Sequence, residues 1–188
     1  MRLFWNCYLY LTGWAIKGSF PYHLKKSVLI VGPHTSNWDF FIGLAFRSKL
    51  RIQHARFLGK QELFTGPFGF FFRKLGGVPV NRSAQNNMVD DVVKLFHAQT
   101  SFLLVLSPEG TRKQVNRLRT GFYHIAKNAG VPIVMTAFDF EHKHLLIAEP
   151  FYPTGNEAAD MKLIIQFYAP VKGKVPGNGM AHLLNENS

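Results

Sequence analysis

The sequence predicts an α/β domain in which a mixed, largely parallel sheet is flanked by helices on both faces. Short, wholly apolar runs, of which 27–32 (SVLIVG) and 102–106 (FLLVL) are the clearest, alternate with longer segments of helical periodicity. Runs that are apolar at every position indicate strands buried on both faces, as in parallel sheets covered by helices. Ligands of such folds bind beyond the carboxyl ends of the strands, so the loops after Gly32 and Leu106 are where chemistry is expected.

The remaining elements follow from periodicity and from residues that start or stop helices. Strands are predicted at 27–32, 55–58, 78–81, 102–106, 131–138, 145–148 and 162–168. Helices are predicted at 37–49, 84–99 and 119–129, and 67–75 is either a short helix or an apolar loop. The helix at 119–129 is expected to stop at Gly130, since glycine is favoured just past a helix C-terminus.

The predicted organisation is an apolar N-terminal helix within residues 1–20, a single domain at 21–175 and a tail at 176–188 that frays. The apolar run from Leu3 to Ile16 would span roughly 21 Å as a helix, which is short of the ~30 Å hydrocarbon core. Its Trp and Tyr residues, with basic residues nearby, favour an anchor lying in the plane of a membrane interface. A helix packed on the core is the alternative, and the sequence leaves both open.

The net charge of +11 lies almost entirely in the first half of the chain. Residues 1–82 carry 12 Lys/Arg against 2 Asp/Glu, whereas residues 83–188 carry 10 against 9. Such a basic half predicts an anionic partner, which is a nucleic acid, an anionic membrane or an anionic substrate or carrier. No helix-turn-helix, zinc-ligand spacing or aromatic RNA-binding pattern is found in the sequence, so nucleic acid is not the expected partner. The lone Cys7 excludes an internal disulfide and is given no catalytic role.

The first motif, Gly32-Pro33-His34-Thr35-Ser36-Asn37-Trp38-Asp39, follows the first apolar strand. His34 and Asp39 are five residues apart, which on one ideal helix would put them on different faces. They can meet only if His34 lies in the loop and Asp39 in the first helical turn. A carboxylate beside an imidazole fixes its tautomer and stabilises the imidazolium, which makes a general base. The spacing alone equally fits a helix-start carboxylate beside an ordinary loop histidine.

The second motif, Ser107-Pro108-Glu109-Gly110-Thr111-Arg112-Lys113, follows the second apolar strand. Gly110 would allow close backbone approach to a ligand, and the adjacent cations suit a phosphate. Between the motifs lies a short Gly-rich strand that leads to Arg82, a further candidate phosphate contact. An exposed charged turn and a solvated arginine are the plain alternatives.

These segments, in this order, resemble the glycerolipid acyltransferase superfamily, whose best-known activity is that of 1-acylglycerol-3-phosphate acyltransferase. The family pattern is a His-x4-Asp block, a Gly-rich strand ending in Arg, a Phe-Pro-Glu-Gly-Thr-Arg block and a Val-Pro-Ile-Val-Pro block. Here the blocks are His34 to Asp39, Gly76 to Arg82, Pro108 to Arg112 and Val131 to Val134, and Lys60-Gln61-Glu62-Leu63 resembles a segment often found between the first two. The resemblance covers residues 27–140 and implies a fold like that of glycerol-3-phosphate acyltransferase.

The resemblance also implies roles for individual residues. His34 would deprotonate the acceptor hydroxyl, which attacks a thioester, and Asp39 would orient His34. The acceptor would be bound by Arg82, Glu109, Gly110, Thr111, Arg112 and Lys60. No metal or other cofactor is implied, because acyl-CoA or acyl carrier protein enters as a co-substrate. The expected place of action is the cytoplasmic face of an anionic membrane, with the protein peripheral or monotopic.

The sequence departs from the family pattern at two positions. Ser107 stands where the family has Phe, and Met135 stands where it has the last Pro of the fourth block. Both changes leave the proposed base untouched but put the identity of the acceptor in doubt, with a 1-acylglycerol-3-phosphate as the default. A non-catalytic or differently specific lipid-surface binder of the same fold is the alternative function. The many Phe residues between 64 and 72 are expected either to line an acyl-chain groove, to meet lipid or to fill the core.

Overall fold

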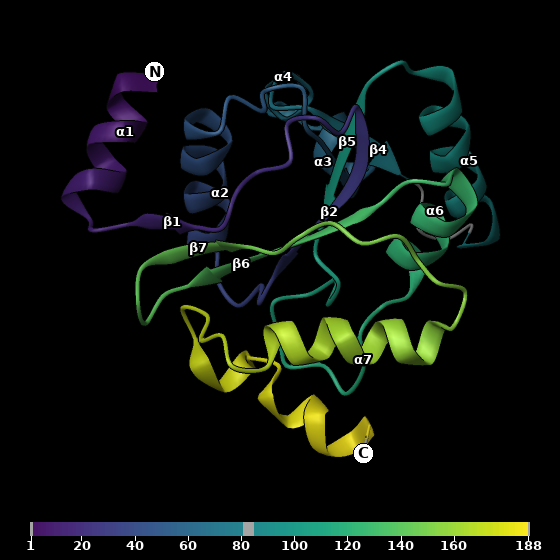
Figure 1. Ribbon diagram of the computed structural model, residues 1–188. Helices are drawn as coiled ribbons and strands as arrows, with labels where there is room; N and C mark the ends of the chain where they lie inside the picture. The colour runs from purple at the N-terminus through teal and green to yellow at the C-terminus, as the bar shows by residue number, and fades with distance from the viewer. Residues whose placement is uncertain (1, 81–84, 188) are drawn as a thin grey trace.

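The computed structural model describes residues 2–80 and 85–187, and over these residues it has a seven-stranded sheet (Figure 1). The strand order is β1-β7-β6-β2-β5-β3-β4, and only β6 and β7 pair antiparallel. The strands are β1 (Ala15–Lys17), β2 (Lys26–Gly32), β3 (Arg56–Lys60), β4 (Gly77–Val80), β5 (Phe102–Leu106), β6 (Ile133–Asp139) and β7 (His144–Ile147). The predicted α/β class with a mixed, largely parallel sheet is confirmed.

Helices cover both faces of this sheet, as the apolar strands require. One layer contains α1 (Arg2–Leu11) and α2 (Trp38–Lys49), whose buried residues meet β2, β6 and β7. The opposite layer contains α5 (Gln85–Ala98), α6 (Gly121–Ala129) and α7 (Glu157–Tyr168). Two short helices, α3 (Glu62–Thr65) and α4 (Gly69–Lys74), connect β3 to β4. The helix α6 ends at Gly130 in the left-handed conformation, as predicted.

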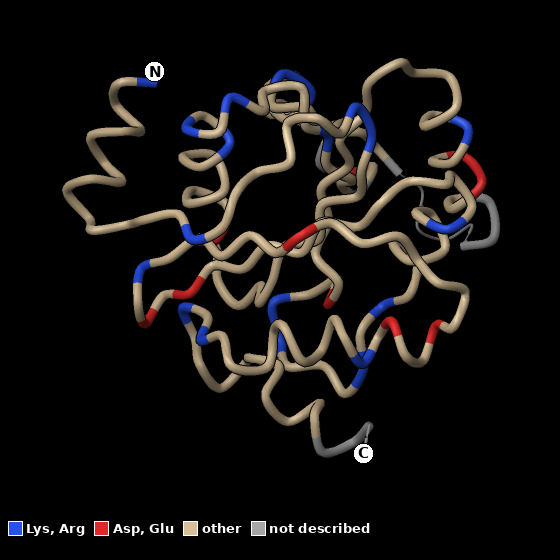
Figure 2. Tube along the Cα trace, viewed as in Figure 1, with Lys and Arg blue, Asp and Glu red and all other residues tan. Residues whose placement is uncertain are grey.

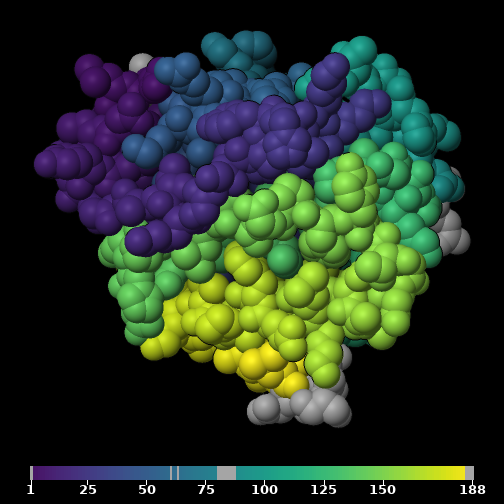
Figure 3. All heavy atoms as spheres, in the orientation of Figure 1, coloured from purple at the N-terminus to yellow at the C-terminus, as the bar shows by residue number. Residues whose placement is uncertain are grey.

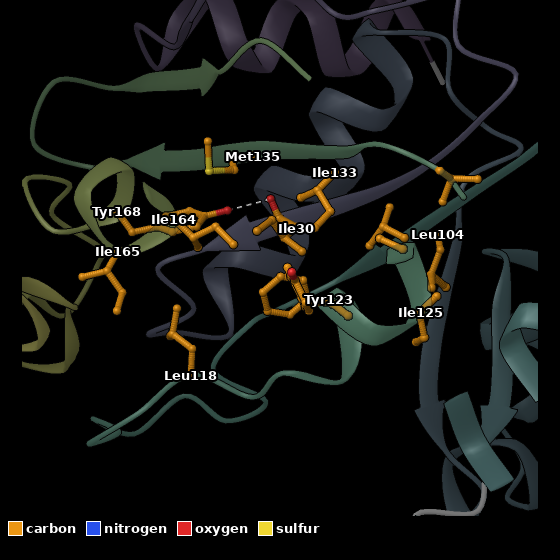
Figure 4. Packing of buried hydrophobic residues seen from close by; sticks show 14 of the residues in the cluster. Ile30, Leu104, Leu118, Tyr123, Ile125, Ile133, Met135, Ile164, Ile165 and Tyr168 are labelled. Atoms are coloured by element: carbon orange, nitrogen blue, oxygen red, sulfur yellow. Dashed lines mark hydrogen bonds between the residues drawn. The ribbon is translucent and has the colours of Figure 1, made fainter. Parts of the chain in front are cut away.

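The core of the second layer ties the last helix to the central strand. The Tyr168 hydroxyl donates a hydrogen bond of 2.8 Å to the carbonyl oxygen of Ile30, deep in the sheet (Figure 4). Tyr168 is fully buried, and burial is the main reason that its pKa lies well above the usual value. Tyr168 therefore stays neutral and acts as a packed hydrogen-bond donor. It fixes α7 beneath the strand that leads into the first motif.

The prediction of a strand at 162–168 is wrong, because this segment is the second half of α7. The residue that starts this helix lies upstream of the predicted strand: the Asn156 side chain caps α7 by accepting from the Ala159 amide at 3.2 Å. The apolar positions Ile164, Ile165 and Tyr168 then recur at the spacing of one helical face. The predicted N-terminal helix is present, but it ends at Leu11, and the short strand β1 follows it.

The expectation that residues 176–188 fray is also wrong for the part up to Leu184. Two 3-10 helices, η1 (Pro176–Asn178) and η2 (Ala181–Asn187), follow α7, and Figure 3 shows the C-terminal part of the chain packed in the lower part of the molecule. They bury Met180 and Leu183 in the main core cluster, at 1% and 0% exposure. The burial of these apolar side chains stabilises the folded segment, despite the Pro and Gly residues that led to the prediction of a frayed tail.

The helix α1 packs against α2 and buries only Leu9 completely. Leu3, Phe4, Tyr10 and Leu11 remain exposed, and so do Trp38, Phe40 and Phe41 of α2, Phe68 just before α4, and Phe70 and Phe71 within α4. In the described part of the chain no helix is long and apolar enough to cross a bilayer. One side of α1 therefore packs on the domain, as the second interpretation expected, and the other presents large apolar residues to the outside. The anchor in the plane of a membrane stays a prediction.

Candidate functional site

Parallel pairing brings the ends of β2, β5, β3 and β4 to one edge of the sheet. Ile30 of β2 lies opposite Leu106 of β5, so the loops that follow these strands emerge as neighbours. Ligand sites of open parallel sheets lie at such an edge. The two predicted motifs are in these loops, and they touch: the backbone N–H of His34 donates to Oε2 of Glu109 at 2.6 Å. The two loops in which chemistry was expected are therefore in direct contact.

His34 lies in the loop and Asp39 in the first turn of α2, as their spacing required. The distance from Nδ1 of His34 to Oδ2 of Asp39 is 3.0 Å. The same Oδ2 accepts from the backbone amides of Thr35 at 2.8 Å and Ser36 at 2.9 Å. A single carboxylate oxygen of Asp39 thus ties the imidazole ring to the backbone of its own loop.

The orientation of the His34 ring follows from this pairing. An ionised carboxylate can only accept, so Nδ1 carries the proton and Nε2 is left with a free lone pair. The His34 side chain is 33% exposed, whereas that of Asp39 is 3% exposed. A buried orienting group with a ring partly open to solvent is the arrangement that a general base acting on a bound substrate needs.

The carboxyl of Glu109 is almost fully buried, at 1% exposure, between the two motif loops. Besides the His34 amide, its Oε2 accepts from the Ser107 hydroxyl at 3.2 Å. Burial raises the pKa of Glu109 to about 7, and its hydrogen bonds to His34 and Ser107 only partly offset this rise. Glu109 was predicted to bind the acceptor. In this conformation it instead fixes the backbone of the loop that carries the base.

The C-terminal segment holds the first motif from the other side. The Thr35 hydroxyl accepts from the backbone N–H of Val175 at 3.1 Å. Gly173 lies so close that a Cβ there would meet Oγ1 of Thr35 at 2.6 Å. Met180 approaches Gly32 in the same way, since a Cβ on Gly32 would meet the methyl carbon of Met180 at 2.7 Å. The loop that carries His34 is therefore enclosed by residues more than a hundred positions later in the chain.

The second motif continues into a long basic loop, residues 107–120. Gly110 has a φ of +67°, which explains why glycine is needed there. Thr111 is half-buried, and its hydroxyl accepts from the Lys113 amide at 3.3 Å. Arg112, Lys113, Arg117 and Arg119 are exposed, and within the described residues none of them has an ion-pair partner. This loop has the unpaired positive charge that the predicted phosphate contact requires.

Lys60 and Arg82 are two further predicted site residues whose side chains the structure does not describe. Lys60 ends β3 and so lies at the same sheet edge by its backbone, but its side chain lies outside the described atoms. Arg82 lies outside the described residues altogether. Among the predicted aromatic residues, Phe64 is buried and Phe72 is half-buried, while Phe68, Phe70 and Phe71 are exposed.

A second histidine–aspartate pair shows that such a contact is not by itself a site. Nδ1 of His142 lies 2.7 Å from Oδ2 of Asp139 in the turn between β6 and β7. Oδ1 of Asp139 also accepts from the amides of Glu141 and His142, which closes the turn. The His142 side chain is 61% exposed. Its position in an open hairpin argues for a turn-stabilising role.

Sequence reasoning missed several contacts that support the site. In the sequence Ser107 stands out only as a departure from the family pattern. In the structure its hydroxyl donates a hydrogen bond to Oε2 of Glu109, and the same hydroxyl oxygen accepts one from the Glu109 backbone N–H at 3.3 Å. Thr35 and Val175 are 140 positions apart, and nothing in the linear pattern links them. Within the described residues, no cluster of three or more His, Cys, Asp or Glu is arranged to hold a metal ion.

Comparison with known proteins shows the family to which the chain belongs. The sequence profile of the acyltransferase family matches residues 15–138, about two thirds of the chain. A mouse (Mus musculus) protein, 1-acyl-sn-glycerol-3-phosphate acyltransferase epsilon, is 35% identical over 94 residues. That match covers 47% of this chain and 26% of the mouse protein, so the chain spans about a quarter of that relative's length.

The fold has a close counterpart among solved structures. It is similar to the crystal structure of the 1-acyl-sn-glycerophosphate (LPA) acyltransferase PlsC from Thermotoga maritima, with a TM-score of 0.60 and 18% sequence identity. The match covers 97% of this chain and 77% of the bacterial one. The expected fold of glycerolipid acyltransferases is thereby confirmed. The family profile spans the His34–Asp39 pair, the Glu109 loop and the β6 strand together, and the chain belongs to the acyltransferase family.

Proposed function

We propose that this protein transfers a fatty acyl group from a thioester donor, acyl-CoA or acyl carrier protein, to the hydroxyl of a lysophospholipid. The observation that carries the proposal is the His34 ring, held by a buried Asp39 and partly open at a sheet edge where a cationic loop also lies. The default acceptor is 1-acylglycerol-3-phosphate, which would give phosphatidic acid. The names of the mouse and bacterial relatives support this choice.

In the proposed reaction, Nε2 of His34 takes the proton of the acceptor hydroxyl as its oxygen attacks the thioester carbonyl carbon. Asp39 stabilises the imidazolium that forms. The tetrahedral intermediate then collapses, the carbon–sulfur bond breaks, and the thiolate receives the proton from His34. The substrate brings its own nucleophile, so neither a protein nucleophile nor an acyl-enzyme is needed.

The acceptor phosphate is assigned to the basic loop 107–120, with Arg112 as its main contact. Guanidinium groups pair well with phosphate, and Arg112 is exposed and has no described carboxylate partner. Gly110, Thr111 and Lys60 remain proposed contributors at the same sheet edge, and Arg82, which lies outside the described residues, remains a proposed contributor from the resemblance alone. Glu109 contributes indirectly, because its carboxyl binds the His34 amide.

The protein is proposed to act at the surface of an anionic membrane, on its cytoplasmic face and as a peripheral or monotopic protein. The exposed aromatic and aliphatic residues of α1, α2 and α4 support this, because single helices with large exposed apolar residues bind at the interface. These helices lie in the upper part of Figure 1, and Figure 2 shows basic positions at the ends of α2 and α4. Basic residues beside an apolar surface add attraction to anionic lipid.

The deciding experiment is a thiol-release assay with purified protein, acyl-CoA and acyl carrier protein donors, and a panel of lysophospholipid acceptors, with mass spectrometry of the products. The wild type should release thiol only when an acceptor is present. His34→Ala should reduce kcat/KM by roughly 10²–10⁴-fold, the range that a general base contributes.

A matched control is His142→Ala, which removes the other histidine that pairs with an aspartate. This variant should keep wild-type rates. If His34→Ala keeps wild-type rates on every acceptor, the proposed mechanism is wrong. If the wild type binds anionic vesicles but never releases thiol with any donor, the chain is a lipid-surface binder and not the proposed enzyme.

A further inference from the structure

The strongest unassigned feature is a small cavity beside the first motif, about 150 Å³ in volume. Its walls come from the end of α1, the start of α2 and the β6–β7 hairpin. The aromatic and aliphatic lining includes Tyr8, Trp14, Trp38, Ile42 and Phe140. A cavity of this size is smaller than a typical site for a whole cofactor, so it suits one group of a larger ligand.

Two lysines line the same cavity, and each is held over an aromatic ring. Nζ of Lys143 lies 5.8 Å from the centre of the Trp14 ring, and Nζ of Lys174 lies 5.9 Å from the centre of the Phe140 ring. Across the described residues, neither ammonium has a carboxylate within ion-pair distance. The neighbouring Lys172, by contrast, is paired with Glu141 at 2.6 Å.

Two unpaired ammonium groups that line one cavity repel each other unless an anion lies between them. The aromatic rings hold the two lysine side chains but do not neutralise their charge. Figure 2 shows basic positions of the hairpin and of the segment before η1 on the left side of the molecule, beside acidic positions of the hairpin. The cavity therefore combines positive charge with an apolar wall, which fits a phosphate attached to a largely apolar chain.

The cavity is directly connected to the candidate site. Lys174 lies between Gly173, which packs on Thr35, and Val175, whose N–H donates to the Thr35 hydroxyl. Trp38 is the first residue of α2, directly after the His34 loop, and Ile42 lies about one turn further along the helix. At 1.5 Å per residue, the stretch from Trp38 to Ile42 spans about 6 Å along the helix, leading away from His34.

The two substrates of the reaction differ in how far the phosphate lies from the reacting group. In a lysophosphatidic acceptor the phosphate lies only a few bonds from the reacting hydroxyl, so it must bind close to His34. In a CoA or carrier-protein donor the whole pantetheine chain separates the phosphate from the thioester. The reaction needs two phosphate sites, and the basic loop 107–120 and the cavity provide one each.

We propose that the cavity binds the phosphate of the donor's 4′-phosphopantetheine arm through Lys143 and Lys174. This inference rests on the proposed acyl transfer and adds the donor site to it. The arm is common to CoA and to acyl carrier protein, so the site accepts either source. Tyr8, Trp38 and Phe140 would line the path of the pantetheine chain toward His34.

The test is the double variant Lys143→Gln/Lys174→Gln, which keeps a side chain with an aliphatic stem at each position and removes the positive charge. The KM for acyl-CoA should rise by roughly tenfold for each lost charge-assisted contact, while the KM for the acceptor stays within about twofold. Lys143→Arg/Lys174→Arg should retain most of the donor affinity. The control is Lys127→Ala/Lys162→Ala, which removes two exposed charges from α6 and α7 and should leave both KM values unchanged.

A binding measurement separates this proposal from the acyltransferase proposal. Calorimetry with CoA and with 4′-phosphopantetheine, each without an acyl group, needs no turnover, so His34→Ala should bind both as the wild type does. The Gln variant should bind both weakly, and acyl carrier protein donors should show the same KM rise as acyl-CoA. The donor site is refuted if CoA binding is unchanged, if only the acceptor KM rises, or if the variant loses affinity for anionic vesicles alone.

Discussion

The two oxygens of the Asp39 carboxylate are used very unequally. Oδ2 accepts from His34, Thr35 and Ser36, whereas Oδ1 is buried and has no partner among the described groups. All the positioning is therefore done by one oxygen. An asparagine that places its amide oxygen there keeps the geometry and loses only the charge.

Asp39→Asn is thus a clean test of the charge. We expect kcat/KM to fall by about 10²-fold or more, because the imidazolium is no longer stabilised. The buried amide NH₂ has no acceptor at the position of Oδ1, which should cost about 1–3 kcal/mol of stability. Steady-state kinetics and thermal unfolding measure the two effects. A variant with wild-type kcat would show that Asp39 serves the fold and not the reaction.

Glu109 gives a prediction about pH. Its pKa in the folded protein is about 7, above the ordinary value, because the carboxyl is buried. Between about pH 4.5 and 7 the folded state then holds a proton that the unfolded state has released, so stability falls as pH rises. The fall should amount to roughly 3 kcal/mol across this window.

Glu109→Gln keeps an acceptor for the His34 amide and removes the titrating group. Its free energy of unfolding, followed by urea denaturation from pH 4 to 8, should lose this downward slope. Ser107→Ala serves as the control, because it removes a hydrogen bond to Oε2 but keeps the carboxyl and hence the slope. A slope that persists in the glutamine variant would assign the proton to another group.

At the scale of elements, the sequence predicted the central strands well because each is a short, uniformly apolar run. The strand β5 was predicted at its observed bounds, and β2 and α2 within one residue of theirs. The strand predicted at 162–168 is wrong because the run of apolar residues fits a strand as well as it fits the buried face of a helix. The cap at Asn156, which decides between them, lies outside that run.

The candidate site was predictable only in part, and for a physical reason. The motif residues meet because neighbouring parallel strands end together, which periodicity can reveal. The contacts of Val175, Gly173 and Met180 with the first motif depend on how the chain returns after α7. That return has no local signature, and Pro176, Gly177 and Gly179 pointed to a loose tail instead.

Met180→Ala tests whether the C-terminal segment is structural. Met180 is 1% exposed and contacts the glycine that precedes the His34 loop. Its truncation should reduce the free energy of unfolding by about 2–5 kcal/mol, the usual range for buried large-to-small changes. Leu184→Ala, at a position 41% exposed, should cost much less. Equal effects of the two changes would mean that the segment does not pack as described.

The exposed residues of α4 give a prediction about lipid binding. Phe68 and Phe70 are 69% and 76% exposed, so Phe68→Ser/Phe70→Ser should leave the free energy of unfolding nearly unchanged. If they enter the membrane interface, each loss should weaken vesicle binding by about 1.5–3 kcal/mol. Vesicle co-sedimentation measures this. The control is Tyr152→Ser, a 61% exposed aromatic on the segment between β7 and α7. Equal vesicle binding by the wild type and both variants would show that Phe68 and Phe70 do not contact the membrane.

For the whole molecule, the uneven charge predicts how salt affects membrane binding. Residues 1–82 carry nearly all of the +11 net charge, and they include α1, α2 and α4. The screening length shrinks from roughly 14 Å to about 4 Å between 0.05 and 0.5 M salt. Affinity for anionic vesicles should therefore fall by tenfold or more over this range, while affinity for neutral vesicles changes little. Tighter binding to duplex DNA than to such vesicles would point to a different partner.

The hydrogen bond between Thr35 and Val175 also has a consequence for synthesis of the protein on the ribosome. It joins residues 140 positions apart, and Gly173 and Met180 close over the same loop. A nascent chain that has already emerged as far as the second motif contains His34, Asp39 and Glu109, yet it lacks the residues that enclose them. Translation must therefore pass Met180 before the base acquires its final surroundings. A truncated chain that ends between Lys113 and α7 contains both motifs but lacks the residues that enclose His34.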